Sequence, residues 1–319
     1  MQLLSLSPYL QSRIHRLNTI PSIDNPCYIK RDDELSFGCS GCKKRKYASL
    51  IHFLLKNAYH KVFMLGGAFS NNVLSLLQYL IENNIDYHLL LLGPPHKNIG
   101  NALYTQLLSH PDNITWISRL QWHLVHQKAK ELQASEKSKS FIIPEGASCI
   151  ESLPGALTLG QDIERNEKEY TLCFKHLFIE SGSGFSAYAL ALYAYLFKKP
   201  WKIHCLILAD KSKQEFLNRC MSWLQTPEHQ ESLAYLIPFF PLTNASFGST
   251  SPSNFNFIRD IAQREGFLID PIYSAKLLKE SNLYIKDNRL IPSSCCIIHS
   301  GGALSLSGFS SQLQQLLSK

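Results

Sequence analysis

The sequence predicts an α/β protein with two open, twisted, mostly parallel sheets and a ligand-binding cleft between them. From about residue 60, short continuous apolar segments alternate with helical segments, which is typical of parallel strands covered on both faces. The alternation forms two series, one before and one after residue 150. The chain has 319 residues, 45% of them hydrophobic, which is enough for a substantial core.

The first series predicts the smaller of the two units, at residues 47–155. A strand at KVFML leads through the turn GGAFSNN into a helix at VLSLLQYLIENN. The strand YHLLLLG and the helix NIGNALYTQLLSH come next. NITWIS is a further strand, and a helix rich in Gln, Lys and Glu separates it from the last strand, SFIIPEG.

The second series predicts the larger unit, which combines residues 1–46 with 156–319. The strand HLFIESG leads through SGFS into the helix AYALALYAYLFKK, and WKIHCLILAD leads into KQEFLNRCMSWL. SSCCIIHSGG leads into the last helix. Residues 226–256 are rich in Pro, Ser, Thr and Asn, and we expect an irregular connection there.

Composition restricts the class of protein. The net charge of +7 suits an anionic ligand or a nucleic acid, although mild positive charge usually affects only solubility and association. The nine cysteines have no regular spacing, which favours reduced thiols in a cytoplasmic protein. The N-terminus MQLLSLSPYLQSRIHRL has no basic region before its apolar part, so no signal peptide is expected. No apolar run is long enough for a membrane span.

Three strand ends carry glycine beside hydroxyl or amide side chains, at residues 66–72, 180–186 and 299–302. Open α/β sheets bind ligands at the carboxyl ends of their strands. Each stretch alone is better explained as an ordinary strand-to-helix turn, which needs glycine and a capping side chain. Three of them in one chain favour a shared site.

The loop SGSGFS ends a strand and opens a helix. Its backbone N–H groups and the positive end of the helix dipole form a cradle for a phosphate group. No Gly-Lys-Ser/Thr follows, and the third glycine of G-x-G-x-x-G is missing. A ligand with a single phosphate therefore fits better than a nucleoside triphosphate or a dinucleotide.

The stretch CSGCKKRK precedes a helix with an apolar stripe. On the helical wheel Arg45 points away from this stripe, towards solvent, and Lys46 lies further out than Lys43 and Lys44. One of those two lysines can point inwards, where the helix dipole and nearby cations disfavour its charged form. A lysine with a lowered pKa suits Schiff-base chemistry. The spacing does not choose between the two, and an exposed basic cluster is the alternative.

Other interpretations of this stretch have less support. A zinc site needs two more ligands, and Cys295-Cys296 has the wrong spacing to supply them. No thioredoxin-like strand precedes Cys39 and Cys42, as a redox pair would require. A nucleic-acid-binding arm is expected in an exposed tail with interleaved aromatic residues. We therefore predict no metal and no nucleic-acid partner.

Several short motifs follow one another along nearly the whole chain. They are KRDD (30–33), GCKKRK (41–46), GGAFSNN (66–72), GN (100–101), IIPEGAS (142–148), GSGFS (182–186), DPIYSAK (270–276) and HSGG (299–302). In this order they resemble the motifs of the pyridoxal-phosphate (PLP) enzymes of the 1-aminocyclopropane-1-carboxylate (ACC) deaminase and D-cysteine desulfhydrase family. The resemblance implies the tryptophan-synthase-β-like fold, also called fold type II, with PLP between the two units.

The resemblance also implies roles for individual residues. Lys43 matches the lysine that forms the Schiff base with PLP and moves the substrate's proton. Ser70 contacts the substrate carboxylate or takes part in proton transfer, and Tyr273 is the candidate acid or base beside the substrate. The other implied contacts are to PLP: Asn71 to the 3′-oxygen, Gly182, Ser183, Gly184, Phe185 and Ser186 to the phosphate, and Ser300, or alternatively Ser274, to the pyridine nitrogen. A hydroxyl partner there does not force the nitrogen to stay protonated, so we expect a mild electron sink.

The sequence departs from the family's motifs at four of these positions. Cys42 replaces the Asn before the lysine, Phe185 replaces a loop glycine, and Asn72 stands where His or Gln is usual. Ser274 stands where ACC deaminases have Glu, which favours the desulfhydrase type.

The resemblance implies a PLP-dependent deaminase or lyase that acts on a small amino acid and gives a 2-oxo acid and ammonia. D-cysteine desulfhydrase-like β-elimination and ACC-like deamination are the two forms considered. The alternative is a relative that binds PLP or an amino acid without turnover. We expect a cytoplasmic protein with no membrane partner and, because the family is usually dimeric, a homodimer.

Overall fold

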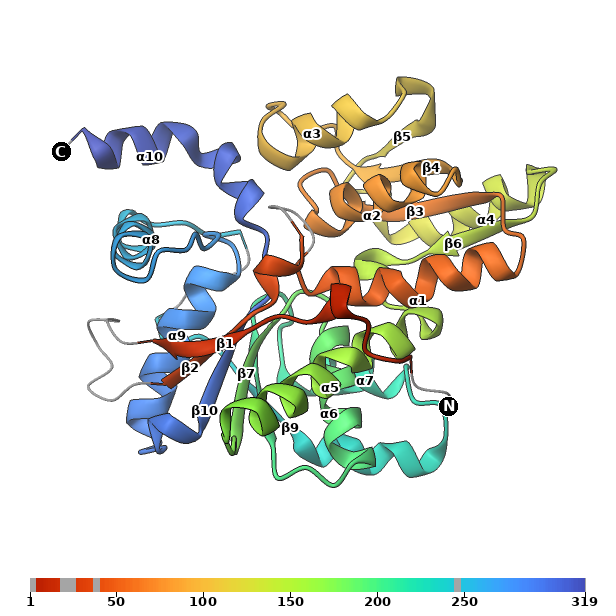
Figure 1. The fold of residues 1–319 in the computed structure, drawn as a ribbon. Coiled ribbons are helices and arrows are strands. Elements are labelled where there is room, and N and C mark those ends of the chain that lie inside the picture. The colour runs from red at the N-terminus through yellow and green to blue at the C-terminus, as the bar shows by residue number, and fades with distance from the viewer. Residues whose placement is uncertain (1–3, 18–26, 37–40, 244–247, 319) are drawn as a thin grey trace.

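The computed structural model describes residues 4–17, 27–36, 41–243 and 248–318, and it contains two mostly parallel sheets flanked by helices (Figure 1). The predicted fold class is confirmed. The larger sheet consists, in spatial order, of β1 (Ile14–Leu17), β2 (Cys27–Arg31), β10 (Cys295–His299), β7 (His176–Ser181), β8 (Lys202–Ile207) and β9 (Leu236–Phe239). The smaller sheet consists of β5 (Ile114–Ile117), β4 (Asp86–Leu92), β3 (Lys61–Gly67) and β6 (Ser140–Ile143). Among these strands only β1 and β2 pair in antiparallel fashion.

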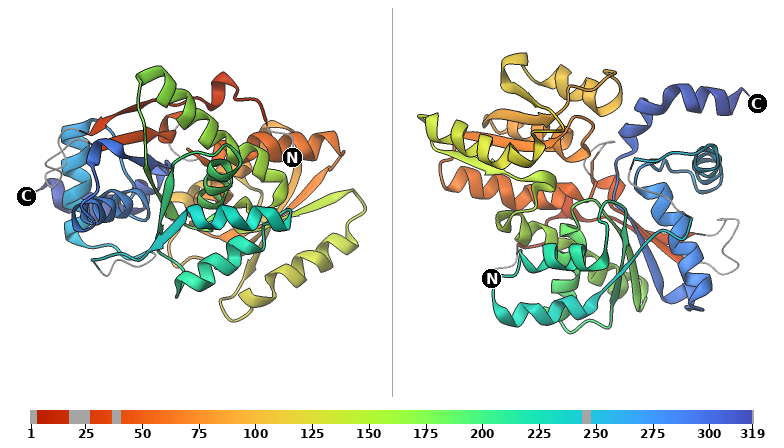
Figure 2. Two further views of the ribbon diagram at one scale, coloured as in Figure 1. Left: turned by 90° about the horizontal axis from the view of Figure 1, so that it is seen from below. Right: turned by 180° about the vertical axis from the view of Figure 1, so that it is seen from behind.

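Helices cover the sheets. They are α1 (Lys43–Lys56), α2 (Asn71–Glu82), α3 (Gly100–Leu108), α4 (Val125–Ser135), α5 (Leu153–Tyr170), α6 (Phe185–Leu196), α7 (Lys213–Met221), α8 (Pro252–Glu265), α9 (Ser274–Asp287) and α10 (Ser310–Leu317). In the larger sheet one core joins the strands to α5 and α6, and a second core joins them to α8 and α9. The smaller sheet has its main core under α1 and α2 and a second core under α4. The last helix, α10, lies at the rim of the molecule beside α8 (Figures 1 and 2).

The expectation of an irregular connection at residues 226–256 is only partly right. This segment contains β9, which pairs with β8, and the start of α8. The strand has the sequence LIPF, and Pro238 argues against a strand in any central position. An edge strand tolerates proline because one side of its backbone needs no partner, and β9 is the edge of the larger sheet.

Both sheets reverse their winding direction next to the strands that carry the glycine-rich turns. In the larger sheet the chain winds from β7 outwards to β8 and β9, and β10 then adds on the other side of β7. In the smaller sheet it winds from β3 to β4 and β5, and β6 then adds on the other side of β3. Such reversals leave a crevice at the carboxyl ends of the strands, where α/β proteins bind ligands.

The boundaries predicted for the two units stay a prediction. All strands of the smaller sheet lie between residues 61 and 143. Helix α1 packs against α2 and, on another side, against α5. The contact with α5 is close: a Cβ added to Gly155 would lie 2.0 Å from the Arg45 carbonyl oxygen. None of the described helices is long and apolar enough to cross a membrane.

Candidate active site

The loop at residues 182–186, here called the phosphate loop, joins β7 to α6. Gly184 precedes the helix with a φ of +87°, a left-handed conformation that glycine adopts without steric cost. Helix α6 has twelve residues, and the N–H groups of its first turn have no partner within the helix. The dipole adds positive charge at this end. The loop can therefore hold an anion such as a phosphate group.

Phe185 is the first residue of α6, and its backbone is not left-handed. Its ring is buried, and the ring centroid lies 5.0 Å from that of Trp223 in an edge-on arrangement. The side chain thus fills the core behind the phosphate loop. Phenylalanine fits where the family has glycine because Gly184 alone provides the left-handed turn.

A loop from the smaller sheet contacts the phosphate loop. The Ser148 hydroxyl donates to Ser183 Oγ at 2.7 Å. Gly146 has a φ of +70°, and a Cβ there would lie 2.8 Å from Ser183 Oγ, so this position requires glycine. The switch points of the two sheets therefore meet at this contact.

Lys46 connects α1 to the same loop. Its Nζ donates a hydrogen bond to the carbonyl oxygen of Gly146. Burial, with the charge of Lys43 as a second cause, lowers the pKa of the Lys46 amine to about 8. The expectation that Lys46 lies further out is wrong, because α1 packs against α2 and α5 and so buries more than its apolar stripe.

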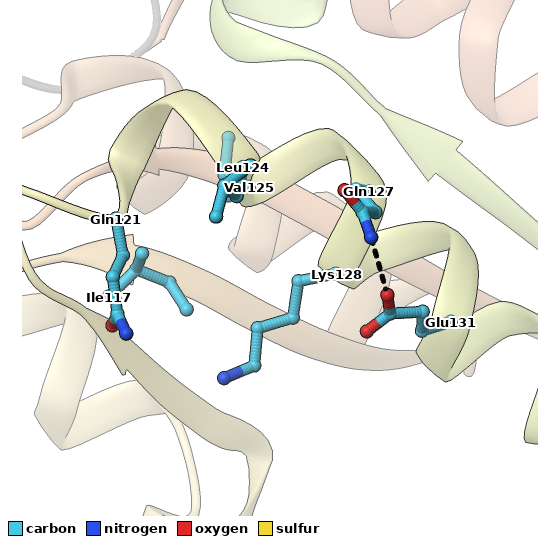
Figure 3. A pocket seen from close by; sticks show the side chains of 7 residues that line it. All are labelled: Ile117, Gln121, Leu124, Val125, Gln127, Lys128 and Glu131. Carbon is cyan, nitrogen blue, oxygen red and sulfur yellow. Dashed lines mark hydrogen bonds between the residues drawn. The ribbon is translucent and has the colours of Figure 1, made fainter.

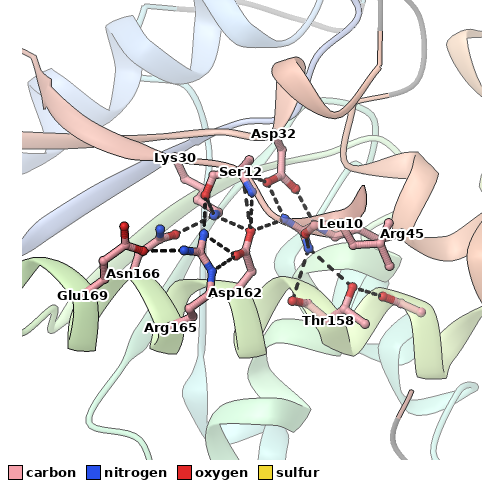
Figure 4. Close-up of polar contacts among 11 residues, drawn as sticks. Leu10, Ser12, Lys30, Asp32, Arg45, Thr158, Asp162, Arg165, Asn166 and Glu169 are labelled. Carbon is pink, nitrogen blue, oxygen red and sulfur yellow. Dashed lines mark hydrogen bonds and ion pairs between the residues drawn. The ribbon is translucent and has the colours of Figure 1, made fainter. Parts of the chain in front are cut away.

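The expectation that Arg45 is solvated is also wrong: its side chain is 1% exposed. Its guanidinium makes two hydrogen bonds of 2.7 Å to the carboxylate of Asp32, and Nη2 lies 2.8 Å from Asp162 Oδ2. Figure 4 shows Asp162 between Arg45 and Lys30, whose Nζ lies 2.5 Å from the same oxygen. Burial lowers the pKa of Arg45, but the two carboxylates outweigh it and the net shift is upwards. The side of α1 that carries Arg45 therefore faces a buried ionic cluster.

Lys43 and Lys44 differ in what their side chains contact. Lys44 is partly buried and its Nζ donates to the Leu35 carbonyl oxygen at 2.8 Å. Lys43 is also partly buried, but within the described part of the chain it makes no hydrogen bond or ion pair. Its charge acts on the pKa values of Cys42, Lys46 and Glu180. Lys43 therefore lies among buried polar groups with its amine uncommitted.

The turn after β10 lies directly against the start of α1. The Cys42 N–H donates to the Ser300 carbonyl oxygen at 2.9 Å, and a Cβ on Gly41 would lie 2.0 Å from that oxygen. The Ser300 hydroxyl donates to Oε1 of Glu180, the penultimate residue of β7. Burial raises the pKa of the Glu180 carboxyl to about 7.

Ser274 and Tyr273 lie where α9 begins. The Ser274 hydroxyl donates to Asp270 Oδ2 at 2.6 Å, and three backbone N–H groups donate to the same carboxylate. The Tyr273 hydroxyl faces the phosphate loop, since a Cβ on Gly182 would lie 3.2 Å from it. Burial, with the charge of Asp270 next, raises the pKa of Tyr273.

Ser70 and Asn71 come from the smaller sheet, at the end of β3. Ser70 caps α2 by accepting the N–H groups of Asn72 and Val73. Asn71 Oδ1 accepts from Asn101 Nδ2 at 2.6 Å. Its Nδ2 faces the turn after β10, because a Cβ on Gly302 would lie 2.8 Å from it. The structure thus brings the predicted residues of both sheets together around one region.

No group of three or more His, Cys, Asp and Glu side chains that could hold a metal ion occurs among the described residues. Burial raises the pKa of Cys42, which disfavours its thiolate. Eight cysteines are described and all are free; the redox interpretation involved Cys39, which lies outside the described residues. The surface pocket of Figure 3, at α4, is lined by none of the predicted site residues.

Comparisons with known proteins agree with the motif order. No protein-family model matches the chain. The chain is 24% identical to the mitochondrial bifunctional D-cysteine desulfhydrase/ACC deaminase of Arabidopsis thaliana, over 97% of this chain and 80% of the relative. The predicted resemblance is confirmed. The chain therefore resembles proteins named for these two activities over nearly its whole length.

Two solved structures have the same fold as this chain. An ACC deaminase homologue superposes with a TM-score of 0.80 at 19% identity, covering 96% of this chain and 94% of the other. A hydrogen sulfide-producing enzyme from Fusobacterium nucleatum superposes with a TM-score of 0.63 at 14% identity, covering 93% and 97%.

Sequence reasoning missed Glu180 and misplaced Lys46 and Arg45. Glu180 was visible as a charged residue inside the apolar strand HLFIES, a position that a carboxylate seldom occupies without a purpose. Lys46 and Arg45 gave no such signal, because a helical wheel shows one apolar stripe and not a second, ionic contact surface.

Proposed function

We propose that this chain is a PLP-dependent deaminase or lyase that converts a small amino acid into a 2-oxo acid and ammonia. The observation that carries the proposal is the position of Lys43. Its amine is uncommitted, at the first turn of α1, and the preceding residue is hydrogen-bonded to Ser300. The phosphate loop and the Ser300 turn follow neighbouring strands, β7 and β10.

The residues present fit PLP. The phosphate loop offers helix N–H groups and the Ser183 hydroxyl. Buried polar atoms near the predicted site residues lack a partner in the described chain, among them Glu180 Oε2 on β7 and Oδ1 of Asn101, whose amide donates to Asn71. Such atoms are costly unless a ligand or water pairs with them. At Gly67 an added Cβ would meet no atom within 4 Å, so the turn after β3 borders open space.

When bound, PLP supplies an aldehyde that condenses with amines and a ring that delocalises the electrons of a broken bond. Lys43 holds the cofactor through Nζ and then carries a proton on the same atom. Lys46 adds a buried cation next to the phosphate loop through Gly146. Asn71 would hydrogen-bond to the 3′-oxygen, and the Ser70 hydroxyl would contact the substrate carboxylate.

Ser300 suits the pyridine nitrogen better than Ser274. The hydroxyl of Ser274 is held by Asp270, whose carboxylate also caps the start of α9. The hydroxyl of Ser300 also donates to a carboxylate, that of Glu180, but this carboxylate lies at the switch point of the larger sheet and its other oxygen has no partner in the described chain. Tyr273 faces Gly182 and is the proposed acid beside the substrate, because its raised pKa keeps the phenol protonated at neutral pH.

The substrate we propose first is D-cysteine, and ACC is second. The family resemblance associates Glu after the site tyrosine with ACC deaminases, and this chain has Ser274 there. The name of the Arabidopsis relative includes both activities, so the pair is a suitable first panel.

The test is the visible absorbance of the purified protein with PLP. We expect a Schiff-base band that borohydride removes, and its loss in Lys43→Ala. Lys44→Ala is the matched control, because its amine is bonded to Leu35 and lies outside the proposed site. A band that persists in Lys43→Ala but is lost in Lys46→Ala would show that Lys46, and not Lys43, holds the cofactor.

Turnover is tested with the same preparations by measuring 2-oxo acid release from D-cysteine and ACC. A band that depends on Lys43 without product from a broad amino-acid panel would favour the non-catalytic binder. The homodimer and the cytoplasmic location stay predictions; sedimentation and fractionation test them.

A further inference from the structure

Glu180 is a buried carboxyl group that none of the proposed roles uses. It lies at the carboxyl end of β7, two residues before Gly182 of the phosphate loop. Oε1 accepts the hydrogen of Ser300 Oγ. Oε2 has almost no exposed surface and no hydrogen-bond partner in the described chain. The pair joins the two strands at the switch point, because β7 and β10 are neighbours.

The charged and titratable groups around Glu180 come from several elements. Lys43, at the start of α1, favours the ionised carboxylate, whereas Asp270, before α9, disfavours it. Cys42, Cys205 on β8 and Tyr273 are the remaining titratable groups whose pKa values are coupled to Glu180. Burial is the largest of the effects on the pKa of Glu180 and raises it to about 7. The group can therefore hold or release a proton near neutral pH.

We propose that Glu180 and Ser300 form a two-step proton relay that ends at the ring nitrogen of the bound cofactor, so that Glu180 sets how strongly the ring withdraws electrons. The inference rests on the proposed function, in which Ser300 faces that nitrogen. Glu180 does not touch the ring in this arrangement and is a positioning residue for the proton.

The relay has two states with the same number of protons. In one, the Glu180 carboxylic acid donates to Ser300 Oγ, and the serine hydrogen is donated to a neutral nitrogen. In the other, the Glu180 proton has moved to Ser300 Oγ and the serine proton has moved to the nitrogen. The serine hydroxyl then points at the carboxylate, and the protonated nitrogen donates to Ser300 Oγ. A hydroxyl can serve both states because it donates one hydrogen and accepts others.

The relay changes the expectation that a serine partner gives a mild electron sink. A serine alone provides no charge to balance a protonated ring nitrogen. The contact between Ser300 Oγ and Glu180 Oε1 is common to both states, and in the second state the serine oxygen is free to accept from the nitrogen. In this arrangement the Glu180 carboxylate, near the end of β7, supplies the balancing charge.

The test uses PLP labelled with ¹⁵N in the pyridine ring and bound to the full-length protein. The ring-nitrogen chemical shift reports protonation directly and does not depend on turnover. In the wild-type protein at pH 8 we expect the pyridinium position. In Glu180→Gln we expect a shift to the neutral-pyridine position, because an amide can donate to Ser300 but cannot release a proton and carry the negative charge that balances a pyridinium. Ser300→Ala interrupts the relay and should shift the resonance in the same direction.

The matched control is Glu167→Gln. Glu167 is another partly buried glutamate, bonded to Phe174 near the opposite end of β7, and its replacement should leave the shift unchanged. Ser300→Thr keeps a hydroxyl and should restore the pyridinium position. If Glu180→Gln does not fold, the Ser300 pair of variants decides the question.

The possible results separate this inference from the proposed function. A wild-type protein without the Lys43-dependent band refutes the proposed function, and the relay with it. A normal band with the same ¹⁵N shift in wild type, Glu180→Gln and Ser300→Ala refutes the relay alone. A neutral nitrogen in the wild-type protein at pH 8 also overturns it, because Glu180 would then exert no control.

Discussion

Two buried polar clusters lie on different sides of the first turn of α1, and they differ in whether their polar groups have partners. Around Arg45 each buried charge has a partner: Arg45 contacts Asp32 and Asp162, and Lys30 contacts Asp162 (Figure 4). On the other side, Lys43 is uncommitted, and Glu180 has one oxygen without a partner in the described chain.

The difference indicates what each cluster does. A closed ionic cluster holds elements in place, since removal of one partner leaves an uncompensated charge. Here the cluster joins the N-terminal segment, α1 and α5. An open cluster costs stability by itself and is retained where a ligand completes it. The closed cluster thus holds α1 in position, and this position places Lys43 in the open cluster, where a ligand can bind.

Replacement of Arg45 by methionine should have the largest effect on stability. It leaves the carboxylates of Asp32 and Asp162 buried with less positive charge, which typically costs about 3–5 kcal/mol. Urea denaturation of the cofactor-free protein measures it. Arg165→Met is the matched control, because Arg165 pairs with Asp162 from a side chain that is 29% exposed and should cost at most about 1 kcal/mol. Equal losses of unfolding free energy in the two variants would contradict the conclusion that each buried charge of the cluster depends on its partners.

Replacement of Phe185 by alanine should have the next largest effect, about 3 kcal/mol, because it leaves a cavity in the aromatic core. The loss should appear in the free energy of unfolding while PLP affinity changes little, since Gly184 keeps the loop's left-handed turn. Phe69→Ala, at an exposed ring, is the control for stability. A tenfold or greater loss of PLP affinity in Phe185→Ala would mean that the ring shapes the phosphate loop itself.

Glu180→Gln should alter the pH dependence of stability. The folded-state pKa of about 7 is raised from 4.5, so the stability linked to Glu180 is complete below pH 4.5 and is lost as the pH rises through 7. Relative to wild type, the variant should therefore gain on the order of 2 kcal/mol between pH 5 and pH 8.

The comparison needs cofactor-free protein and urea denaturation at both pH values. Glu164→Gln is the matched control. The pKa of Glu164 is lowered to about 2: burial opposes the shift, and hydrogen bonds from Lys168, Tyr193 and Lys199 outweigh it. Its replacement should shift stability by the same amount at pH 5 and pH 8. A flat difference for Glu180→Gln would show that its carboxyl is solvated.

The parallel sheets and the phosphate loop were predictable because their signals are local. Apolar runs such as KVFML and glycine followed by hydroxyl residues each report on their own segment. The position of β9 was not predictable from its own segment. Pro238 is acceptable only at the edge of a sheet, and strand order is a property of the whole sheet. Arg45 was misplaced for the same reason: its partners are 13 and 117 residues away.

The residues of the candidate site also differ in whether they could be predicted from their own segment. The motifs around Lys43, Asn71 and Ser300 could be read in order, and the structure brings them together. Glu180 belongs to none of those motifs. Its relation to Ser300 depends on the pairing of β7 with β10, which joins residues 120 apart in the sequence.

Lys43→Met should have the smallest effect on stability and so provides the sharpest contrast with Arg45→Met on the same helical turn. Lys43 makes no hydrogen bond or ion pair with the described chain, and methionine keeps most of its apolar stem. We expect a change within about 0.5 kcal/mol in the cofactor-free protein, as for substitutions away from special contacts. The same variant should lose the PLP band completely. A loss of several kcal/mol would instead mean that Lys43 is the ionic partner of Glu180, and the open cluster would then be a closed one like its neighbour.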